Sequence, residues 1–360
     1  MTDLSNTFGI TLRNFQKFPE QPDPLELIEF GVNAEKLGFD SLFVWDHVLL
    51  GVDPHFPIID SLTLLTAISM RTKKIKLGTG ILVLPVRNPV LLAKQLSSMD
   101  QISGGRLLLG LASGWYKREF DALGVPFNKR GNIMDQNLEI MTRLWQDDMV
   151  TAEIGPYNLR NSVMFPKPVK KAGPPILIGG YADRVLKRAA SWDGWLTYFY
   201  TPEGFIKSWN KIIDYAEEAG KDPAALRFGT LRFTCVTDSR AEARDFANNA
   251  LFQNRLAGSL RRRQEVMEDN GMMREIPAEG EPSIDDIVEN LIIGDVETCI
   301  EKCVVEIQQV GAVHTAMFFQ VGNFPHRAAM RSLERFAGEV IPGIEKIVGP
   351  LDRLAQRTAA

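Results

Sequence analysis

The sequence has little cysteine, no long apolar run and no strong excess of charge of either sign. Three cysteines among 360 residues are too few and too poorly spaced for a disulfide framework. A net charge of -4 at pH 7 gives no basic field, so we expect no nucleic-acid partner. No apolar run reaches roughly 18 residues, and the chain does not start with a basic segment followed by an apolar one. We therefore expect neither membrane insertion nor secretion, and a cytoplasmic location.

The motifs of several common enzyme classes are also missing. Gly78–Gly80 is followed by a further apolar run instead of a helix, which argues against a dinucleotide-binding Rossmann fold. Phe8–Leu12 contains no HxH pair, and Ser113 lies in LASGW and not in GxSxG, which argues against an amidohydrolase and a serine hydrolase. Cys299 and Cys303 have no third ligand nearby in the sequence, so we predict buried core residues and no metal site.

Apolar strand-like runs alternate with amphipathic helical segments along most of the chain. This alternation is typical of α/β proteins with a parallel sheet. The runs that we interpret as strands are Phe8–Leu12, Ser41–Trp45, Lys74–Gly80, Arg106–Ala112, Ile176–Ile178, Gly194–Tyr198, Arg227–Val236 and Ala312–Phe319. Eight strands with helices between them predict a (β/α)8 TIM barrel.

We predict one barrel domain over residues 1–345, followed by a C-terminal tail at 346–360. Two segments interrupt the alternation. Glycine and proline residues at about 150–174 predict a surface insertion with a small hairpin. The polar stretch within about 258–290 lacks a strand pattern and is long for a loop, so we expect it to cap the active site or to mediate contacts.

In a TIM barrel the reacting groups lie at the C-terminal ends of the strands. The candidates that follow the predicted strands are Asp46, His47, Thr79, Gly80, Ser113, Gly114, Trp115, Tyr116, Gly179, Gly180, Tyr181, Tyr198 and Tyr200. This set is rich in glycine, aromatic rings and hydroxyl groups, but it offers one histidine near the strands and no paired carboxylates. It favours binding of a flat cofactor over hydrolysis of a polar bond.

The glycines in this region indicate where a ligand would lie. Gly78, Gly80, Gly110 and Gly114 cluster around the third and fourth predicted strands, and a planar ligand needs backbone without side chains. Gly179-Gly180 precedes a predicted helix, whose free N–H groups favour an anion.

His47 is the residue that we choose as the acid–base group, and we assign its neighbour Asp46 to catalysis with it. An imidazole exchanges protons near neutral pH, although a loop histidine bonded to a backbone carbonyl is the alternative. His314, at the start of the last predicted strand, is expected to be structural. The Arg261-Arg262-Arg263 run is interpreted as a solvated face, the alternative being a contact with a phosphate or a substrate carboxylate. Four aromatic residues suggest an aromatic-lined substrate pocket, with ordinary packing as the alternative: Trp115, Tyr116, Tyr198 and Tyr200.

At these residues the chain resembles the bacterial luciferase-like superfamily of flavin and deazaflavin oxidoreductases. The resemblance covers GFDSLFVWDH at 38–47, the segment Gly78–Trp115, REFDALGVPF at 118–127 and PPILIGG at 174–180. It implies a cofactor across the C-terminal strand ends, a histidine at the position of His47 and a non-prolyl cis peptide between Gly80 and Ile81. The residues that it implies for the cofactor are Thr79, Gly80, Ile81, Ser113 and Gly114, with the phosphate at Gly179, Gly180 and Tyr181. Ser113 is a departure, because luciferase has an arginine there.

The resemblance leaves two chemistries and one non-enzymatic interpretation open. In the first, which we prefer from the sequence, a separate flavin reductase supplies reduced FMN, and the protein uses it with O2 to oxygenate a small, apolar organic substrate. In the second, the deazaflavin coenzyme F420 exchanges a hydride with the substrate. In the third, the barrel binds a cofactor without catalysis. The resemblance also implies a homodimer through the second and third helices. The candidate contacts, which could instead simply cover the barrel, are Leu64, Leu65, Ile68, Leu91 and Leu92.

Overall fold

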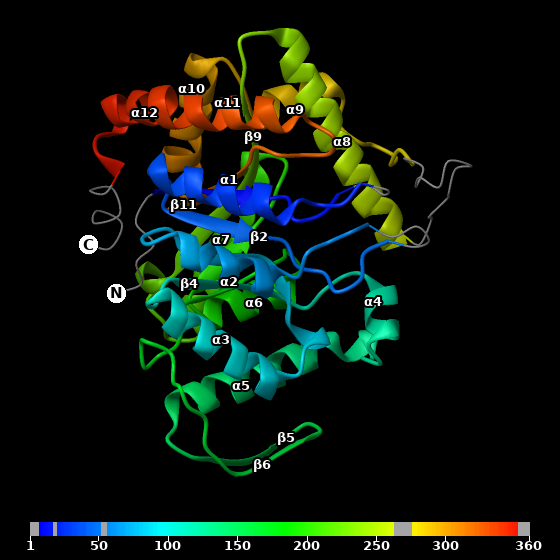
Figure 1. Ribbon diagram of the computed structural model, residues 1–360, viewed down its shortest axis with the longest axis vertical. Coiled ribbons are helices and arrows are strands. Elements are labelled where there is room, and N and C mark those ends of the chain that lie inside the picture. Colours follow the sequence, from blue (N-terminus) through cyan, green and yellow to red (C-terminus); the bar gives the residue numbers. More distant parts are fainter. Residues whose placement is uncertain (1–6, 17–19, 52–55, 263–275, 352–360) are drawn as a thin grey trace.

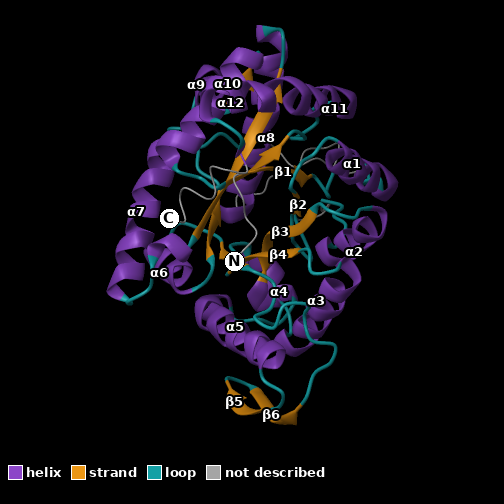
Figure 2. Cartoon of the chain, turned by 90° about the vertical axis from the view of Figure 1, so that its left-hand side faces the viewer, coloured by secondary structure: helices purple, strands orange, loops and turns teal. Residues whose placement is uncertain are grey.

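The computed structural model describes residues 7–16, 20–51, 56–262 and 276–351. Over these residues, parallel strands close into a barrel with helices around it (Figures 1 and 2). The strands follow the order β9, β11, β1, β2, β3, β4, β7 and β8, and pairing between β8 and β9 closes the ring. Their bounds are β1 Thr7–Leu12, β2 Ser41–Val44, β3 Lys76–Val83, β4 Leu107–Ala112, β7 Ile176–Ile178, β8 Gly194–Thr197, β9 Arg227–Val236 and β11 His314–Phe318. The predicted TIM barrel is confirmed.

The helices connect successive strands and cover the outside of the barrel, as Figure 2 shows. Among the described residues, no helix combines the length and the apolar character needed to cross a membrane. The α-helices are α1 Pro24–Lys36, α2 Ser61–Arg71, α3 Pro89–Ser103, α4 Lys117–Ala122, α5 Arg130–Gln146, α6 Asp183–Ser191, α7 Pro202–Glu218, α8 Arg240–Arg262, α9 Ile284–Asn290, α10 Val296–Val305, α11 His326–Arg335 and α12 Ile341–Val348.

The α3 helix begins and ends at residues whose chemistry explains the boundaries. The Asn88 side chain accepts hydrogen bonds from the N–H groups of Val90 and Leu91, and Pro89 occupies the first helical position. Gly104 ends the helix in the left-handed region, at φ 72°. The helix thus connects β3 to β4, which pair in parallel, so the C-terminal ends of these two strands lie side by side.

The β3 strand does not stop at Gly80, where the sequence predicts its end, but continues to Val83. A cis peptide joins Gly80 and Ile81, as the family resemblance implies. The register of β3 against β4 shifts between Thr79 and Leu82. The end of β3 therefore has an irregular backbone beside β4.

Two of the glycines singled out for a ligand serve packing inside the barrel. A β-carbon on Gly78 would lie 2.3 Å from the Phe43 ring, and one on Gly110 would lie 2.2 Å from the carbonyl oxygen of Thr79. The absence of a side chain at both positions makes room for the protein's own atoms. The interpretation of these two glycines as ligand contacts is therefore wrong.

The first insertion contains the hairpin that the sequence predicts. β5 (Val150–Ile154) and β6 (Tyr157–Ser162) pair antiparallel, and Figure 1 shows them extending from the barrel below α5.

The second insertion ends in a helix that the sequence does not predict, α9, and a short strand, β10 (Ile292–Gly294), follows it. Among the described residues β10 pairs with the C-terminal part of β9, outside the ring. Three residues are too few to give a recognisable strand pattern. Residues 263–275 of this insertion, and 352–360 of the predicted tail, lie outside the described residues.

The α8 helix crosses the C-terminal end of the barrel. A second hydrophobic cluster, separate from the main core, contains the buried residues Leu50, Phe56, Tyr116 and Leu260, with Phe15, Trp115 and Phe252 packed against them. Phe252 and Leu260 belong to α8, whereas the others follow β1, β2 and β4. The C-terminal half of α8 therefore packs on loops at the mouth of the barrel, the end at which these strands finish.

The predicted dimer face is not made of the residues expected. Leu64, Leu65, Ile68 and Leu92 are each no more than 2% exposed and pack in the main core, so they cover the barrel. Only Leu91 is exposed, at 58%.

Candidate active site

His47 lies at the mouth of the barrel, just after β2, and is 8% exposed. Its Nδ1 is 3.2 Å from Oε2 of Glu119. Its ring packs edge-on against Trp115, with 5.4 Å between the centroids. A carboxylate at Nδ1 favours the tautomer with the proton on that nitrogen and fixes the ring. Nε2 is then the nitrogen that can exchange a proton with a bound molecule.

Glu119 is a site residue that the sequence reasoning missed. It is 1% exposed and belongs to the short helix α4. Its Oε1 accepts hydrogen bonds from the N–H groups of Val48 (2.5 Å) and Leu49 (3.3 Å), while Oε2 contacts His47. Both oxygens are therefore used to hold the loop after β2. The sequence marks Glu119 only by its place in the REFDALGVPF block. A single acidic residue on a helix is usually solvent-exposed, so it did not stand out as a site residue.

Asp46 is buried at 3% exposure and faces protein groups. Its Oδ1 accepts from the Ser61 hydroxyl (2.7 Å) and pairs with the Arg87 guanidinium (2.5 Å), and its Oδ2 accepts from the N–H of Val83 (2.9 Å). These contacts tie the loop after β2 to the end of β3. They are the contacts of a positioning residue, and the catalytic role of Asp46 stays a prediction.

The predicted cofactor residues on β3 come together with the turn after β7. Thr79 is buried, and its hydroxyl donates to the Gly110 carbonyl at 2.9 Å. The side chain of Ile81 lies against Gly179, where a β-carbon would come within 2.3 Å of Cδ1. The structure therefore brings the Gly80-Ile81 peptide next to the Gly179-Gly180 turn.

Ser113 and Gly114 form the turn after β4. Gly114 adopts φ 79°, and a β-carbon there would come within 2.8 Å of Val83 and Phe120, so both the backbone and the space require glycine. The Gly114 carbonyl accepts from Nε of Arg130 at 3.2 Å. Ser113 is partly exposed beside this turn.

The turn Gly179–Tyr181 leads into α6. Gly180 has φ 115°, a conformation that side chains rarely adopt, and its carbonyl accepts from the Trp195 indole at 2.7 Å. Tyr181 is 55% exposed, and its ring lies 5.7 Å from that of Phe199. The Gly179 N–H donates to the Leu111 carbonyl at 2.8 Å, so the phosphate assignment depends on the N–H groups of Gly180 and Tyr181.

Two arginines near these turns were also missed by the sequence reasoning. Arg130 lies at the start of α5, and both burial and the nearby positive charge of Arg184 lower its pKa. Within the described residues neither guanidinium is paired with a carboxylate. Like charges held together without a counterion are typical of an anion site. This chain has Ser113 at the position where luciferase has an arginine. Arg130 nevertheless brings a positive charge to the same turn, because its Nε donates to the Gly114 carbonyl. Nothing in the local sequence marks it, since this contact depends on how α5 packs.

Five aromatic rings form a continuous row across the upper interior of the barrel. The ring centroids are 5.1 Å apart for Phe15 and Trp45, 5.2 Å for Trp45 and Phe318, 5.1 Å for Phe318 and Phe233, and 5.3 Å for Phe233 and Tyr198. These rings come from β1, β2, β11, β9 and β8 or the residues just after them. We call them the aromatic row. Their surface suits an apolar or planar molecule.

Four buried polar atoms, on residues in or just after the same strands, have no hydrogen-bond partner among the described residues. They are the Thr11 hydroxyl, Nε1 of Trp45, Oε1 of Gln320 and the Tyr200 hydroxyl. Buried polar groups are nearly always paired, so these atoms point to a ligand with hydrogen-bonding groups.

The four predicted substrate residues differ in their environment. Trp115 is partly exposed beside His47, and Tyr198 ends the aromatic row. Burial raises the pKa of Tyr198 and of Tyr200, so both phenols stay protonated at neutral pH. Tyr116 is 1% exposed, and its hydroxyl already donates to the Gly51 carbonyl at 2.7 Å. Its contacts are those of a packing residue, and its role toward substrate stays a prediction.

Metal binding has no support in the part of the chain that the structure describes, where no group of three or more His, Cys, Asp and Glu side chains is placed to hold an ion. Cys299 and Cys303 are buried, as predicted, and burial raises the pKa of the Cys299 thiol to about 12.

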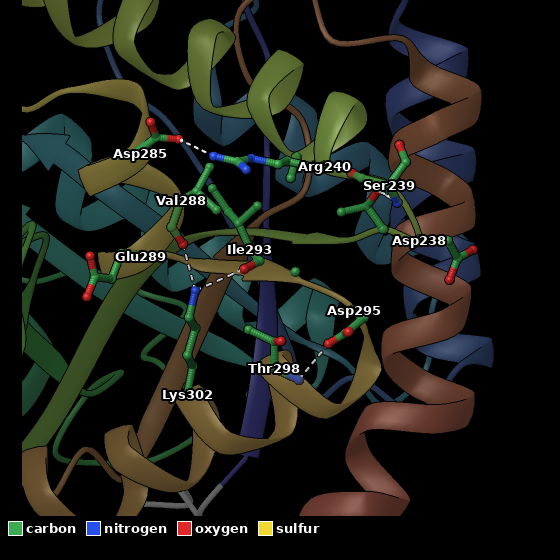
Figure 3. A pocket seen from close by; sticks show the side chains of 13 residues that line it. Asp238, Ser239, Arg240, Asp285, Val288, Glu289, Ile293, Asp295, Thr298 and Lys302 are labelled. Carbon is green, nitrogen blue, oxygen red and sulfur yellow. Dashed lines mark hydrogen bonds and ion pairs between the residues drawn. The ribbon is translucent and has the colours of Figure 1, made fainter.

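A cavity of about 500 Å³ lies away from His47, between the start of α8, α9, β10 and the start of α10 (Figure 3). The Lys302 ammonium, which lines it, already donates to the carbonyls of Val288, Leu291 and Ile293. Asp295 caps α10 by accepting from the N–H of Thr298. Because its polar groups are engaged in the fold, this cavity is a poorer candidate than the mouth of the barrel.

Comparison with known proteins finds a matching family model and several related sequences. A family model described as luciferase-like monooxygenase matches residues 7–314. An uncharacterized protein, y4vJ, of Sinorhizobium fredii is 27% identical, over 89% of this chain and 92% of the relative. The 5,10-methylenetetrahydromethanopterin reductase of Methanolobus tindarius is 27% identical, over 67% and 69%. The FMNH2-dependent dimethylsulfone monooxygenase of Pseudomonas putida is 28% identical, over 51% of each chain.

Solved structures share the fold. The monooxygenase RslO1 from Streptomyces bottropensis superimposes with a TM-score of 0.77 at 20% identity, over 93% of this chain and 99% of that one. An F420-dependent secondary alcohol dehydrogenase, solved with an F420–acetone adduct, gives a TM-score of 0.75 at 21% identity, over 94% and 99%.

Proposed function

The chain belongs to the luciferase-like monooxygenase family, and from that premise we propose that it is an F420-dependent oxidoreductase that transfers a hydride between the deazaflavin and a small organic substrate. The observation that carries the catalytic part is the His47–Glu119 pair, a buried and oriented acid–base group at the mouth of the barrel. The substrate class, a small organic molecule, and the hydride transfer between it and the deazaflavin are both part of this proposal.

The preference for F420 over FMN rests on the sequence relatives. The methanopterin reductase matches over two thirds of both chains, and the solved tetrahydromethanopterin reductase from Methanopyrus kandleri is described as coenzyme F420 dependent. The FMNH2-dependent monooxygenase matches over half. An F420-dependent glucose-6-phosphate dehydrogenase of Amycolatopsis mediterranei is 30% identical over 45% of this chain. The FMN monooxygenase with a separate reductase, which the sequence alone led us to prefer, becomes the second candidate, and the match to the dimethylsulfone monooxygenase favours it.

The residues at the mouth fit a cofactor of this kind. The N–H groups of Gly180 and Tyr181 and the guanidinium groups of Arg130 and Arg184 would provide hydrogen bonds and positive charge for a phosphate. The Gly80-Ile81 peptide would support the ring system. The unpartnered buried atoms near the aromatic row supply hydrogen bonds to polar edges of the bound molecules. When bound, the deazaflavin supplies a carbon that gives or accepts a hydride.

The protein's own part in the reaction is proton transfer and exclusion of water. Glu119 holds Nδ1 of His47, so Nε2 can give a proton to a substrate oxygen as the carbon that bears it accepts a hydride, or take that proton back as the carbon gives the hydride up. The second hydrophobic cluster brings α8 over the mouth and limits access of water from that side.

The first experiment compares binding of the two cofactors. The purified protein is titrated with F420 by fluorescence and, without oxygen, with reduced FMN. We expect tight binding of F420. Tight binding of reduced FMN alone, with oxygen uptake above the rate of the free flavin, would overturn the proposal in favour of the second candidate.

Two variants test the site itself. Arg130→Gln is expected to weaken F420 binding about tenfold through loss of one charge-assisted contact. His47→Gln is expected to leave binding unchanged and to abolish oxidation of reduced F420 by a panel of aldehydes and ketones. Turnover that is unchanged in His47→Gln would show a barrel that binds cofactor without using this histidine.

A further inference from the structure

Arg261 reaches over the mouth of the barrel from the C-terminal end of α8. Its guanidinium carbon lies 5.4 Å from the centroid of the Trp115 ring. Its Nη1 donates to the Tyr181 hydroxyl at 3.1 Å. Trp115 follows β4 and Tyr181 follows β7, so this one side chain joins two strand ends on the side of the mouth opposite the aromatic row.

The packing of α8 fixes the position of this charge. The preceding residue, Leu260, is 3% exposed within the second hydrophobic cluster. About two turns before Leu260, the side chain of Gln253 accepts a hydrogen bond from the N–H of Gly322 at 3.2 Å. The end of α8 is therefore held between the loop after β11 and the loop after β4, and Arg261 has a defined place instead of a freely solvated one.

Within the part of the chain that the structure describes, no carboxylate pairs with Arg261. Its side chain contacts an indole ring and a phenol. The same indole ring packs against His47. A fixed guanidinium group one ring away from the acid–base residue is suited to a carboxylate, which it binds through two parallel N–H groups.

We propose that Arg261 binds an acidic group of the substrate, so that the substrate is a small organic carboxylate whose apolar body lies on the aromatic row. This inference rests on the proposed function, because it assumes that the cofactor occupies the mouth. The phosphate of that cofactor has its own cations in Arg130 and Arg184, which leaves Arg261 for the substrate.

The test uses a matched pair of probes, 4-phenylbutyrate and 4-phenylbutanol, which differ in charge but share an aromatic body. Their dissociation constants are measured by calorimetry on the F420-loaded full-length protein. We expect the acid to bind at least tenfold more tightly than the alcohol. Arg261→Gln should remove this preference and leave the alcohol unchanged. Arg240→Gln is the control, since Arg240 is exposed on the opposite end of the same helix.

Each other outcome would overturn the inference. Equal binding of both probes, no binding of either, or an equal loss in Arg240→Gln would show that Arg261 does not select an acidic group. If Arg261→Gln weakens F420 binding and not probe binding, the guanidinium serves the cofactor's anionic groups. A wild-type protein that binds no F420 at all would instead contradict the proposed function.

Discussion

At the scale of single residues, we expect catalysis to depend on Glu119 as much as on His47. Glu119→Gln keeps the shape but replaces the oxygen that faces Nδ1 with an NH2 donor, so Nδ1 must accept and the proton of the neutral imidazole moves to Nε2. We expect turnover to fall about 10- to 100-fold, the usual effect of removing an orienting carboxylate behind a functional histidine. The measurement is steady-state kinetics together with the F420 dissociation constant.

A matched control lies two residues away. Asp121→Asn removes an exposed carboxylate of the same helix that pairs with Lys117. We expect it to leave turnover unchanged, and both variants to bind F420 as the wild type does. A Glu119→Gln variant with an unaltered pH profile of turnover would show that the carboxylate does not act through His47.

The site could be predicted from the sequence only in part, for a physical reason. His47 and the Gly179-Gly180 turn directly follow strands, and in parallel barrels that position alone places them at one end. Glu119 and Arg130 reach the site through the packing of α4 and α5, which depends on contacts far apart in the sequence. No local pattern contains that information.

His314 confers a pH dependence on stability. Its Nδ1 contacts the Thr7 hydroxyl at 3.0 Å and its Nε2 contacts the Ser41 hydroxyl at 2.8 Å, inside the barrel. Burial lowers its pKa from 6.5 to about 4, and the charge of Lys76 adds to this while Asp40 opposes it. In the unfolded chain the imidazole takes up its proton near pH 6.5, so acidification favours unfolding between pH 6.5 and pH 4.

We therefore expect the free energy of unfolding to fall by about 3 kcal/mol from this residue as the pH is lowered across that window. Below pH 4 the loss levels off, because both states are then protonated. Urea unfolding of wild type and His314→Gln at several pH values isolates the contribution. The variant should be less stable at pH 7 but flatter between pH 6.5 and pH 4, and parallel curves would contradict the assignment.

At the scale of elements, a buried ion pair joins β9 to the π-helical turn Glu306–Val310 that follows α10. Nε of Arg232 lies 2.7 Å from Oε1 of Glu306, and both side chains are 3% exposed. The guanidinium also donates to the carbonyls of Phe199 (2.9 Å) and Asn290 (2.5 Å). One side chain thus connects the end of β8, the end of α9 and the turn after α10.

Removing Glu306 alone should lower the free energy of unfolding much more than replacing both Arg232 and Glu306 with apolar residues. Glu306→Ala is expected to lower the free energy of unfolding by about 3–5 kcal/mol, because it leaves a buried, uncompensated guanidinium. The double replacement Arg232→Met with Glu306→Leu should recover most of that loss. Urea unfolding measures both, with the exposed Glu301→Ala as control. A single variant as stable as the control would refute the argument.

The same elements show what sequence patterns can and cannot give. The barrel strands could be predicted, because strands buried on both faces are nearly continuous apolar runs. β10 could not, since Ile292–Gly294 is only three residues long. The helical pattern of α8 predicts its existence but not its direction, and it is the packing of Leu260 and Phe252 on the barrel mouth that makes this helix part of the site.

At the scale of the whole molecule, the predicted homodimer needs a different face from the one proposed from the sequence. Leu91 of α3 is exposed, and three residues further along the helix Lys94 donates to the Phe165 carbonyl. About two turns beyond Lys94, Gln101 donates to the Lys167 carbonyl at 2.9 Å. The segment after β6 therefore lies along α3. Phe165, which is 64% exposed, adds to the apolar surface of that helix.

We expect two copies to associate through this surface, because exposed large apolar side chains that gather on one face mark an interaction site. Leu91→Glu combined with Phe165→Glu should convert a dimer into a monomer without changing the circular dichroism of the barrel, since neither side chain is buried in the core. Leu25→Glu, which changes a residue 69% exposed on α1, should remain dimeric. Light scattering after size exclusion distinguishes these outcomes. A wild-type protein that is monomeric at micromolar concentration would show that this surface is not a dimer interface.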